Sequence, residues 1–224
     1  MHLLSVPLAR AFAYLTLEEL TLGTGIYLPN LAASLVEKCR FLKSPSSPQE
    51  FNLPEGIAFE SGVFDGIVIR KLTVFPLVMH LDAADSTDQA QQALLGLLQW
   101  AKDQFGLHYY PGMIPRWAFV SDVVFQADIP LLERLNTPLN SISAKISEAV
   151  RGNLKEELEY RPAKLWLAHN PDRRSASIAP FTIEHLAFSL DEENKFYSEA
   201  PIPTKDHLSL LAELENGLKD ENEG

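Results

Sequence analysis

The hydrophobic and polar residues of positions 86–105 repeat at steps of three and four, which is the spacing of an amphipathic helix. The apolar positions on one face are Ala90, Ala93, Leu94, Leu97, Leu98, Ala101 and Phe105. Gly106 follows directly, and glycine readily adopts the left-handed backbone with which many helices end. This segment is the strongest helix prediction in the chain.

Three more segments carry a helical repeat. One begins at a cap near Asn30, one at Thr137 with Pro138 in its first turn, and one near Thr204. Their apolar stripes are Leu31, Leu35, Cys39 and Leu42 in the first, Leu139, Ile142, Ile146, Ala149 and Val150 in the second, and Leu208, Leu211, Leu214 and Leu218 in the third. We expect each stripe to face the core, with Cys39 acting as a small buried hydrophobic residue.

Other segments have the alternation or the β-branched composition of strands. Asp65-Gly66 joins two such runs, 56–64 and 67–75, and predicts a hairpin because its tight turn needs positive φ. The second run meets Pro76 and resumes at 77–81, so we expect a bulge or an edge position there. Further strands are predicted at 116–128, with Trp117, Phe119, Val123 and Phe125 on one side, at 163–169, and as a hairpin of 181–190 with 195–200.

The first 28 residues are apolar but lack a clear period. Two interpretations stay open: a helix followed by a short strand, or an arm that packs on another subunit. Residues 44–56 form a Pro/Ser-rich connector. Helices and hairpin-joined strands together predict an α+β fold, with a mostly antiparallel sheet of about five to six strands packed with about four helices. We expect one domain over 1–215 and an acidic, frayed tail over 216–224.

Composition narrows the class of protein. The 224 residues carry a formal net charge of −11, which disfavours nucleic-acid binding. A single cysteine excludes an internal disulfide framework and a cysteine-cluster zinc site. No run approaches the ~18 apolar residues of a membrane-spanning helix. We therefore expect a cytoplasmic protein without a membrane segment, cofactor or resident metal.

The polar stretch 80–89, HLDAADSTDQ, is the best candidate for chemistry. Most of it is explained as a helix start. Ser86 and Gln89 have capping-box spacing, and Asp88 lies in the first turn, where the helix dipole favours a negative charge. His80 and Asp82 remain without such an explanation.

The alternative to a helix cap is a small metal-dependent hydrolase. It would use His80 and Asp82 at a strand end, with His169 or His185 brought in by the fold. Neither a metal motif such as HExxH nor a GxSxG nucleophile motif accompanies these residues.

Two loops are candidates for binding. The segment 107–117 is rich in residue types that interfaces favour, namely Tyr109, Tyr110, Met113 and Trp117. It either anchors a partner or lies over the edge of its own core. Arg173 and Arg174 in the loop 170–180 have the chemistry to clamp a carboxylate or phosphate.

The leading hypothesis is a non-catalytic, cytoplasmic protein-interaction or assembly protein that forms homo-oligomers. Its acidic charge suits a basic protein partner. The apolar N-terminal segment and the aromatic loop offer hydrophobic contact surface.

Overall fold

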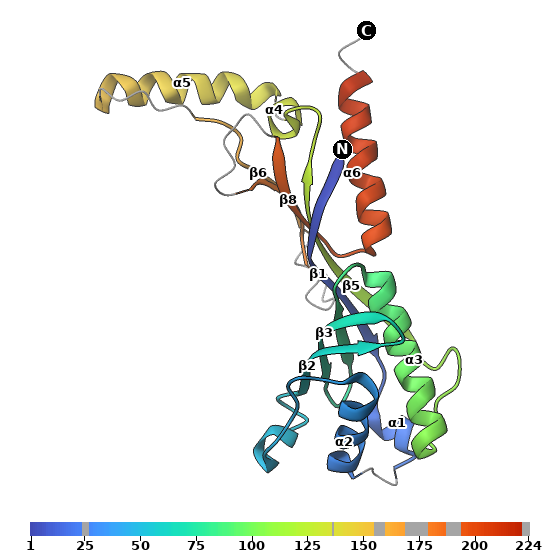
Figure 1. Cartoon of the computed structure of the whole chain (residues 1–224). Helices are drawn as coiled ribbons and strands as arrows, with labels where there is room; N and C mark the ends of the chain where they lie inside the picture. The colour runs from blue at the N-terminus through green and yellow to red at the C-terminus, as the bar shows by residue number, and fades with distance from the viewer. Residues whose placement is uncertain (24–26, 136, 155–159, 169–178, 187–193, 221–224) are drawn as a thin grey trace. The chain divides into compact units, whose positions relative to one another are not determined.

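The structure, a computed structural model, describes residues 1–23, 27–135, 137–154, 160–168, 179–186 and 194–220 (Figure 1). The strands are β1 (His2–Tyr14), β2 (Ile57–Phe64), β3 (Ile67–Val74), β4 (Met79–Ala83), β5 (Arg116–Gln126), β6 (Lys164–Leu167), β7 (Phe181–His185) and β8 (Lys195–Ala200). The helices are α1 (Leu17–Thr21), α2 (Leu28–Cys39), α3 (Thr87–Phe105), α4 (Leu131–Leu135), α5 (Thr137–Leu154) and α6 (Thr204–Asp220), with a 3-10 helix η1 (Pro48–Phe51).

The protein has the α+β fold that its sequence predicts. The described strands form one sheet of eight in the order β2-β3-β4-β1-β5-β8-β7-β6. Every strand pair of known register is antiparallel. The strand count exceeds the expectation because β1 was not recognised and the predicted strand over 67–81 is in fact two strands. No helix in the described ranges has a stretch both long and apolar enough to cross a membrane.

The chain divides into two compact units, and β1 and β5 contribute residues to both. We name them after their long helices. The α3 unit comprises Val6–Ser121 and Pro201–Lys205, and the α6 unit comprises Met1–Ser5, Asp122–Ala200 and Asp206–Gly224.

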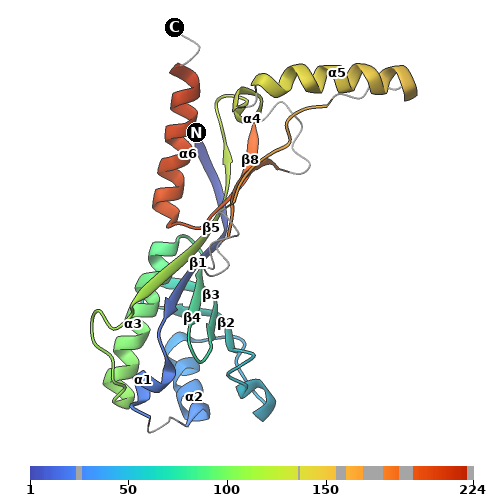
Figure 2. The same ribbon diagram turned by 180° about the vertical axis from the view of Figure 1, so that it is seen from behind.

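The core of the α3 unit lies between its strands and the helices α2 and α3. Both views show α3 alongside these strands (Figures 1 and 2). Leu72, Leu81 and Leu94 are among its buried residues. Gly96 lets the helix come close, because a methyl group there would lie 2.5 Å from a ring carbon of Phe64. Cys39 is fully buried in this core, as predicted, and burial raises the pKa of its thiol to about 11.

The N-terminal segment corrects the interpretation of a helix followed by a short strand. It forms the long strand β1, and the short helix α1 comes after it. Ala9, Ala11 and Ala13 are fully buried and lie opposite residues of β4. The alternation is present, but small alanines give it little contrast in hydrophobicity, which is why the pattern did not identify a strand.

The helix starts were predicted with mixed success. Ser86 caps α3 by accepting a 3.2 Å hydrogen bond from the backbone of Gln89, and Gly106 ends the helix with φ of 70°. The predicted cap at Asn30 is wrong. Helix α2 begins earlier, after Tyr27, and ends at Cys39, so Leu42 lies outside it and is 82% exposed.

The first residues of α3 and α6 are hydrogen-bonded to each other inside the α3 unit. The backbone N–H of Thr87 donates to Oγ1 of Thr204 at 3.0 Å, and the backbone N–H of Thr204 donates to Oγ1 of Thr87 at 2.7 Å. Ser121 adds a hydrogen bond to the Thr204 hydroxyl at 3.1 Å. All three side chains are buried. These bonds satisfy amides that would otherwise lack partners at the first turns of α3 and α6.

The hairpin predicted at Asp65-Gly66 and the bulge or edge position predicted at Pro76 had different outcomes. Asp65 and Gly66 both have positive φ and join β2 to β3, as predicted. Pro76 does not interrupt a continuous strand. It lies in the turn between β3 and β4, which the hydrogen bond from Phe75 N to Val78 O closes at 2.9 Å. The register irregularity of this strand pair lies between Ile69 and Lys71 instead.

The α6 unit contains the predicted hairpin of β7 with β8, and β6 pairs with β7 at the sheet edge. Leu211 of α6 is buried, as expected. The same helix also buries two polar residues that the pattern did not single out, His207 and Glu215. The Glu215 carboxylate accepts from the backbone of Asp128 at 2.5 Å and lies 2.6 Å from the amino group of Met1.

The apolar stripe of α5 does not face a core, contrary to the expectation. Leu139, Ile142 and Ile146 are exposed by 46%, 51% and 41%. Helix α6 continues to Asp220, so residues 216–220 of the predicted tail are helical.

Candidate functional site

The two residues of the catalytic alternative, His80 and Asp82, lie on one face of β4 because they are two positions apart. Arg10 on the neighbouring strand binds both oxygens of Asp82, with Nε 2.5 Å from Oδ1 and a terminal nitrogen 2.7 Å from Oδ2. Asp82 is only 5% exposed. The pair is a bidentate, charge-assisted contact that neutralises the buried carboxylate.

His80 lies between two aromatic rings. Its ring centre is 5.3 Å from that of Phe12 and 5.8 Å from that of Phe75. Burial, together with the positive charge of Arg10, lowers the pKa of His80 to about 4. The imidazole is therefore neutral at physiological pH and acts as a packed aromatic residue.

The other histidines of that alternative lie elsewhere in the chain. His185 belongs to the α6 unit, where it lies 3.4 Å from Glu133 and packs 4.8 Å from the ring centre of Phe196. His169 is outside the described residues. Across the described ranges, no group of three or more His, Cys, Asp or Glu side chains is placed to hold a metal ion.

The aromatic loop packs on its own core, which is one of the two interpretations left open by the sequence. Tyr109 and Met113 are buried in the core of the α3 unit, and Trp117 packs against it. Of the four candidate residues, only Tyr110 is exposed, at 51%. Arg173 and Arg174, the residues of the proposed anion clamp, lie outside the described residues.

A buried serine–histidine pair in the α6 unit was missed by the sequence interpretation. Ser198 Oγ lies 2.9 Å from His207 Nε2, and both side chains are fully buried. The Ser198 hydroxyl donates its proton to the carbonyl of Thr182 at 2.6 Å, so the imidazole donates to the serine. This direction is opposite to that of an activated nucleophile, in which the histidine accepts the serine proton. The pair holds α6 to the strands.

Charged side chains form a row across the strands of the α3 unit. Cross-strand neighbours alternate in sign along the row, which consists of Lys43, Glu60, Lys71, Asp82 and Arg10. Their strand neighbours, such as Leu72 and Leu81, belong to the core, so the row lies on the face opposite that core. The row continues to the edge strand β2, where Lys43 Nζ lies 3.0 Å from Glu60 Oε2.

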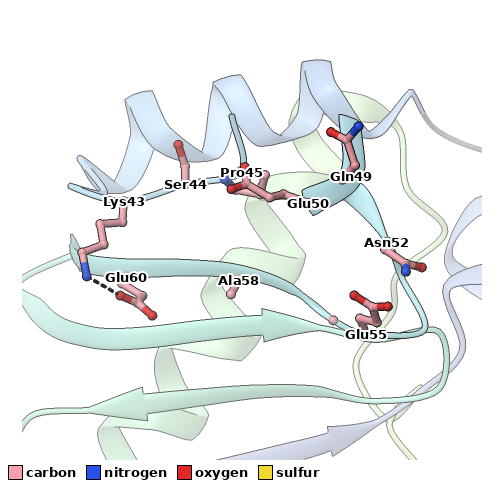
Figure 3. A pocket seen from close by; sticks show the side chains of 10 residues that line it. Lys43, Ser44, Pro45, Gln49, Glu50, Asn52, Glu55, Ala58 and Glu60 are labelled. Carbon is pink, nitrogen blue, oxygen red and sulfur yellow. Dashed lines mark hydrogen bonds and ion pairs between the residues drawn. The ribbon is translucent and has the colours of Figure 1, made fainter. Parts of the chain in front are cut away.

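A groove lies at that edge, between β2 and the segment 43–56 (Figure 3). Its volume is about 650 Å³, within the range of ligand sites in proteins. The lining residues are Lys43, Ser44, Pro45, Gln49, Glu50, Asn52, Glu55, Gly56, Ala58 and Glu60. They include three glutamates and a single lysine, so the groove is acidic.

The groove has a fixed wall. Glu50 accepts hydrogen bonds from the backbone amides of Ser46 and Ser47, at 2.5 and 3.0 Å, and they hold the pKa of its carboxyl below its usual value. In return, the Ser47 side chain accepts from the backbone N–H of Glu50, which completes a capping box at the start of η1. On the opposite wall, the ion pair with Lys43 lowers the pKa of Glu60. Both carboxylates are therefore ionised at neutral pH.

The sequence interpretation missed this groove because it treated residues 44–56 only as a connector. The available signal was the spacing of Glu50, Glu55 and Glu60 in and after a turn-rich segment. No known protein-family model matches the chain, and no curated protein is significantly similar to it. A function is therefore inferred from the geometry of the groove.

Proposed function

We propose that this chain is a non-catalytic, cytoplasmic protein-interaction protein that binds a basic segment of a partner protein in the groove beside β2. The observation that carries the proposal is the acidic lining of the groove, where Glu50 and Glu60 are held ionised beside the exposed Glu55. A basic segment entering it gains Coulomb attraction from the groove and from the net charge of −11.

The surroundings of His80 and Asp82 support a non-catalytic role. A metal ligand or general base needs a carboxylate or imidazole that a substrate can reach. Asp82 is bound at both oxygens by Arg10, and His80 is half-buried and packs against Phe12 and Phe75. The lone buried cysteine is compatible with a reducing compartment.

A second part of the proposal is self-association through α5. Leu139, Ile142 and Ile146 recur at the three- and four-residue steps by which helices pair, and all three are exposed. A second copy of the chain is the occupant that we propose for this surface.

Calorimetric titration with three capped hexapeptides tests the main proposal. Hexalysine is expected to bind, with an affinity that falls as salt is raised, because screening weakens attraction between exposed charges. Hexaserine and hexaglutamate are expected not to bind. Equal binding of hexalysine and hexaserine would contradict the proposal, because an acidic groove must discriminate between them.

A further inference from the structure

The backbone of β2 leaves one residue without a strand partner beside the groove. Lys43 and Glu60 exchange two backbone hydrogen bonds, of 3.2 Å from Lys43 N and 2.9 Å from Glu60 N. The backbone groups of Glu60 therefore point to the outer edge of the sheet. Along a strand, the backbone groups of every second residue point to the same edge. The N–H and C=O of Ala58 therefore also point outward, toward the groove that Ala58 lines.

The pairing of β2 with β3 also indicates that the backbone groups of Ala58 point to the outer edge. Phe75 N bonds to Val78 O, so the backbone groups of Phe75 and, by alternation, of Thr73 point toward β4. Thr73 is the residue opposite Ala58 in the β2–β3 register, and the two therefore do not bond each other through the backbone. Among the backbone hydrogen bonds of the described residues, none joins Ala58 to a segment on the outer edge.

Pro45 explains why the chain does not use this edge itself. If the segment after Lys43 continued to pair with β2, Pro45 would lie opposite Ala58. Proline has no N–H to donate, so pairing stops and the segment turns away into η1. The result is a groove whose floor is an unpaired edge of a strand (Figure 3).

We propose that an extended, basic segment of the partner adds to β2 as an antiparallel strand, with one of its residues exchanging two backbone hydrogen bonds with Ala58. This inference rests on the proposed function and adds the mode of binding. Strand addition gives affinity through the main chain and selects side chains by their alternation.

The position of the basic side chain follows from the alternation. The partner residue opposite Ala58 projects its side chain to the face that carries Glu60 and Thr73. Ala58 contributes only a methyl group there, which leaves room for a long side chain. A lysine or arginine at this position would lie beside the Glu60 carboxylate and near Glu55, whereas the residues on either side project to the opposite face. Thr73 Oγ1, in the same row, is buried without a hydrogen-bond partner among the described residues.

Backbone-methylated peptides test the inference at constant charge. The probe is a capped hexapeptide of alternating lysine and valine. In the proposed arrangement the lysine amides face β2 and the valine amides face outward. N-methylation of the lysine residues is therefore expected to weaken binding at least about tenfold, and N-methylation of the valine residues to leave it unchanged within about twofold.

Amide hydrogen exchange of the wild-type protein, followed by NMR, supplies the second readout. The Ala58 amide is expected to exchange at least about tenfold more slowly with the unmethylated peptide bound, whereas the Glu60 amide, already bonded to Lys43, serves as the internal reference. Binding without protection of Ala58, or equal effects of the two methylated peptides, would overturn strand addition and leave the acidic interaction site intact. Failure of the unmethylated peptide and of hexalysine to bind would overturn both proposals.

Discussion

Arg10 on β1 binds both carboxylate oxygens of Asp82 on β4. This contact gives Asp82 a structural role within the stretch 80–89, which was the best candidate for chemistry in the sequence. The two residues are direct cross-strand neighbours. The Asp82 side chain is buried and the Arg10 side chain is 29% exposed, so the positive charge of Arg10 replaces the water that would otherwise solvate the carboxylate.

The contact between Arg10 and Asp82 predicts an asymmetric response to mutation. Asp82→Asn should lower the free energy of unfolding by about 2 to 3 kcal/mol, because it leaves a partly buried guanidinium without its counter-charge. The double variant Arg10→Met with Asp82→Leu should recover most of that loss, because no charge then remains unpaired. Urea denaturation of the wild type and the variants measures both effects. A double variant as unstable as Asp82→Asn would show that the ion pair is not the cause.

His80 predicts how stability depends on pH. Its pKa in the folded protein is about 4, below the value of 6.5 for an exposed histidine. Between these values the unfolded chain binds a proton that the folded protein does not, so stability is lost as pH falls from about 6.5 to about 4. The shift corresponds to a loss on the order of 3 kcal/mol.

The matched variant for this prediction is His80→Phe, which keeps an aromatic ring between Phe12 and Phe75. Urea denaturation at a series of pH values should show a shallower decline for this variant between pH 6.5 and 4. Parallel curves for the wild type and the variant would contradict the assignment.

The reciprocal hydrogen bonds between Thr87 and Thr204 predict that mutations of the two residues affect stability in a coupled way. Removing either hydroxyl, by Thr87→Ala or Thr204→Ala, should lower the free energy of unfolding by about 1 to 2 kcal/mol. The reason is that the backbone amide at the start of the other helix loses its hydrogen-bond acceptor. The double variant should lower the free energy of unfolding by less than the sum of the two single changes, because the two residues share one network. A double-mutant cycle by thermal denaturation measures the coupling, and strict additivity would contradict it.

The exposed apolar stripe of α5 predicts that a charged residue placed in it prevents self-association. Ile142→Lys should shift the molar mass measured by light scattering from that of an oligomer to that of a monomer. The stability of the monomer should change by no more than about 0.5 kcal/mol, because Ile142 is 51% exposed. A wild-type chain that is monomeric at micromolar concentration would contradict self-association directly.

Local signals in the sequence were sufficient for several elements. The cap at Ser86, the stop at Gly106 and the turn at Asp65-Gly66 each depend on residues adjacent in sequence, and all three appear as predicted. The α+β class follows from the same signals. The order of hairpins and amphipathic helices is enough to predict a mostly antiparallel sheet.

The features that were missed depend on residues far apart in the sequence. The buried alanines of β1 are recognisable as a strand only beside β4, about 70 residues later, as the Arg10–Asp82 pairing shows at a separation of 72 residues. The groove exists because Lys43 pairs with Glu60, 17 positions away, and because Pro45 then ends the pairing. The periodicity of α5 predicts an apolar stripe correctly but does not say what covers it.

The central claim is that carboxylates of the β2 groove bind a basic segment, and paired variants test it most directly. Glu55→Gln removes one charge from the groove lining, and Glu18→Gln removes one charge from an exposed position on α1 outside it. Titration of both variants with the lysine–valine hexapeptide is expected to show at least about a threefold weaker affinity for Glu55→Gln and an unchanged affinity for Glu18→Gln. Equal affinities for the two variants would mean that the peptide responds only to the net charge of the chain, and the groove would lose its assigned role.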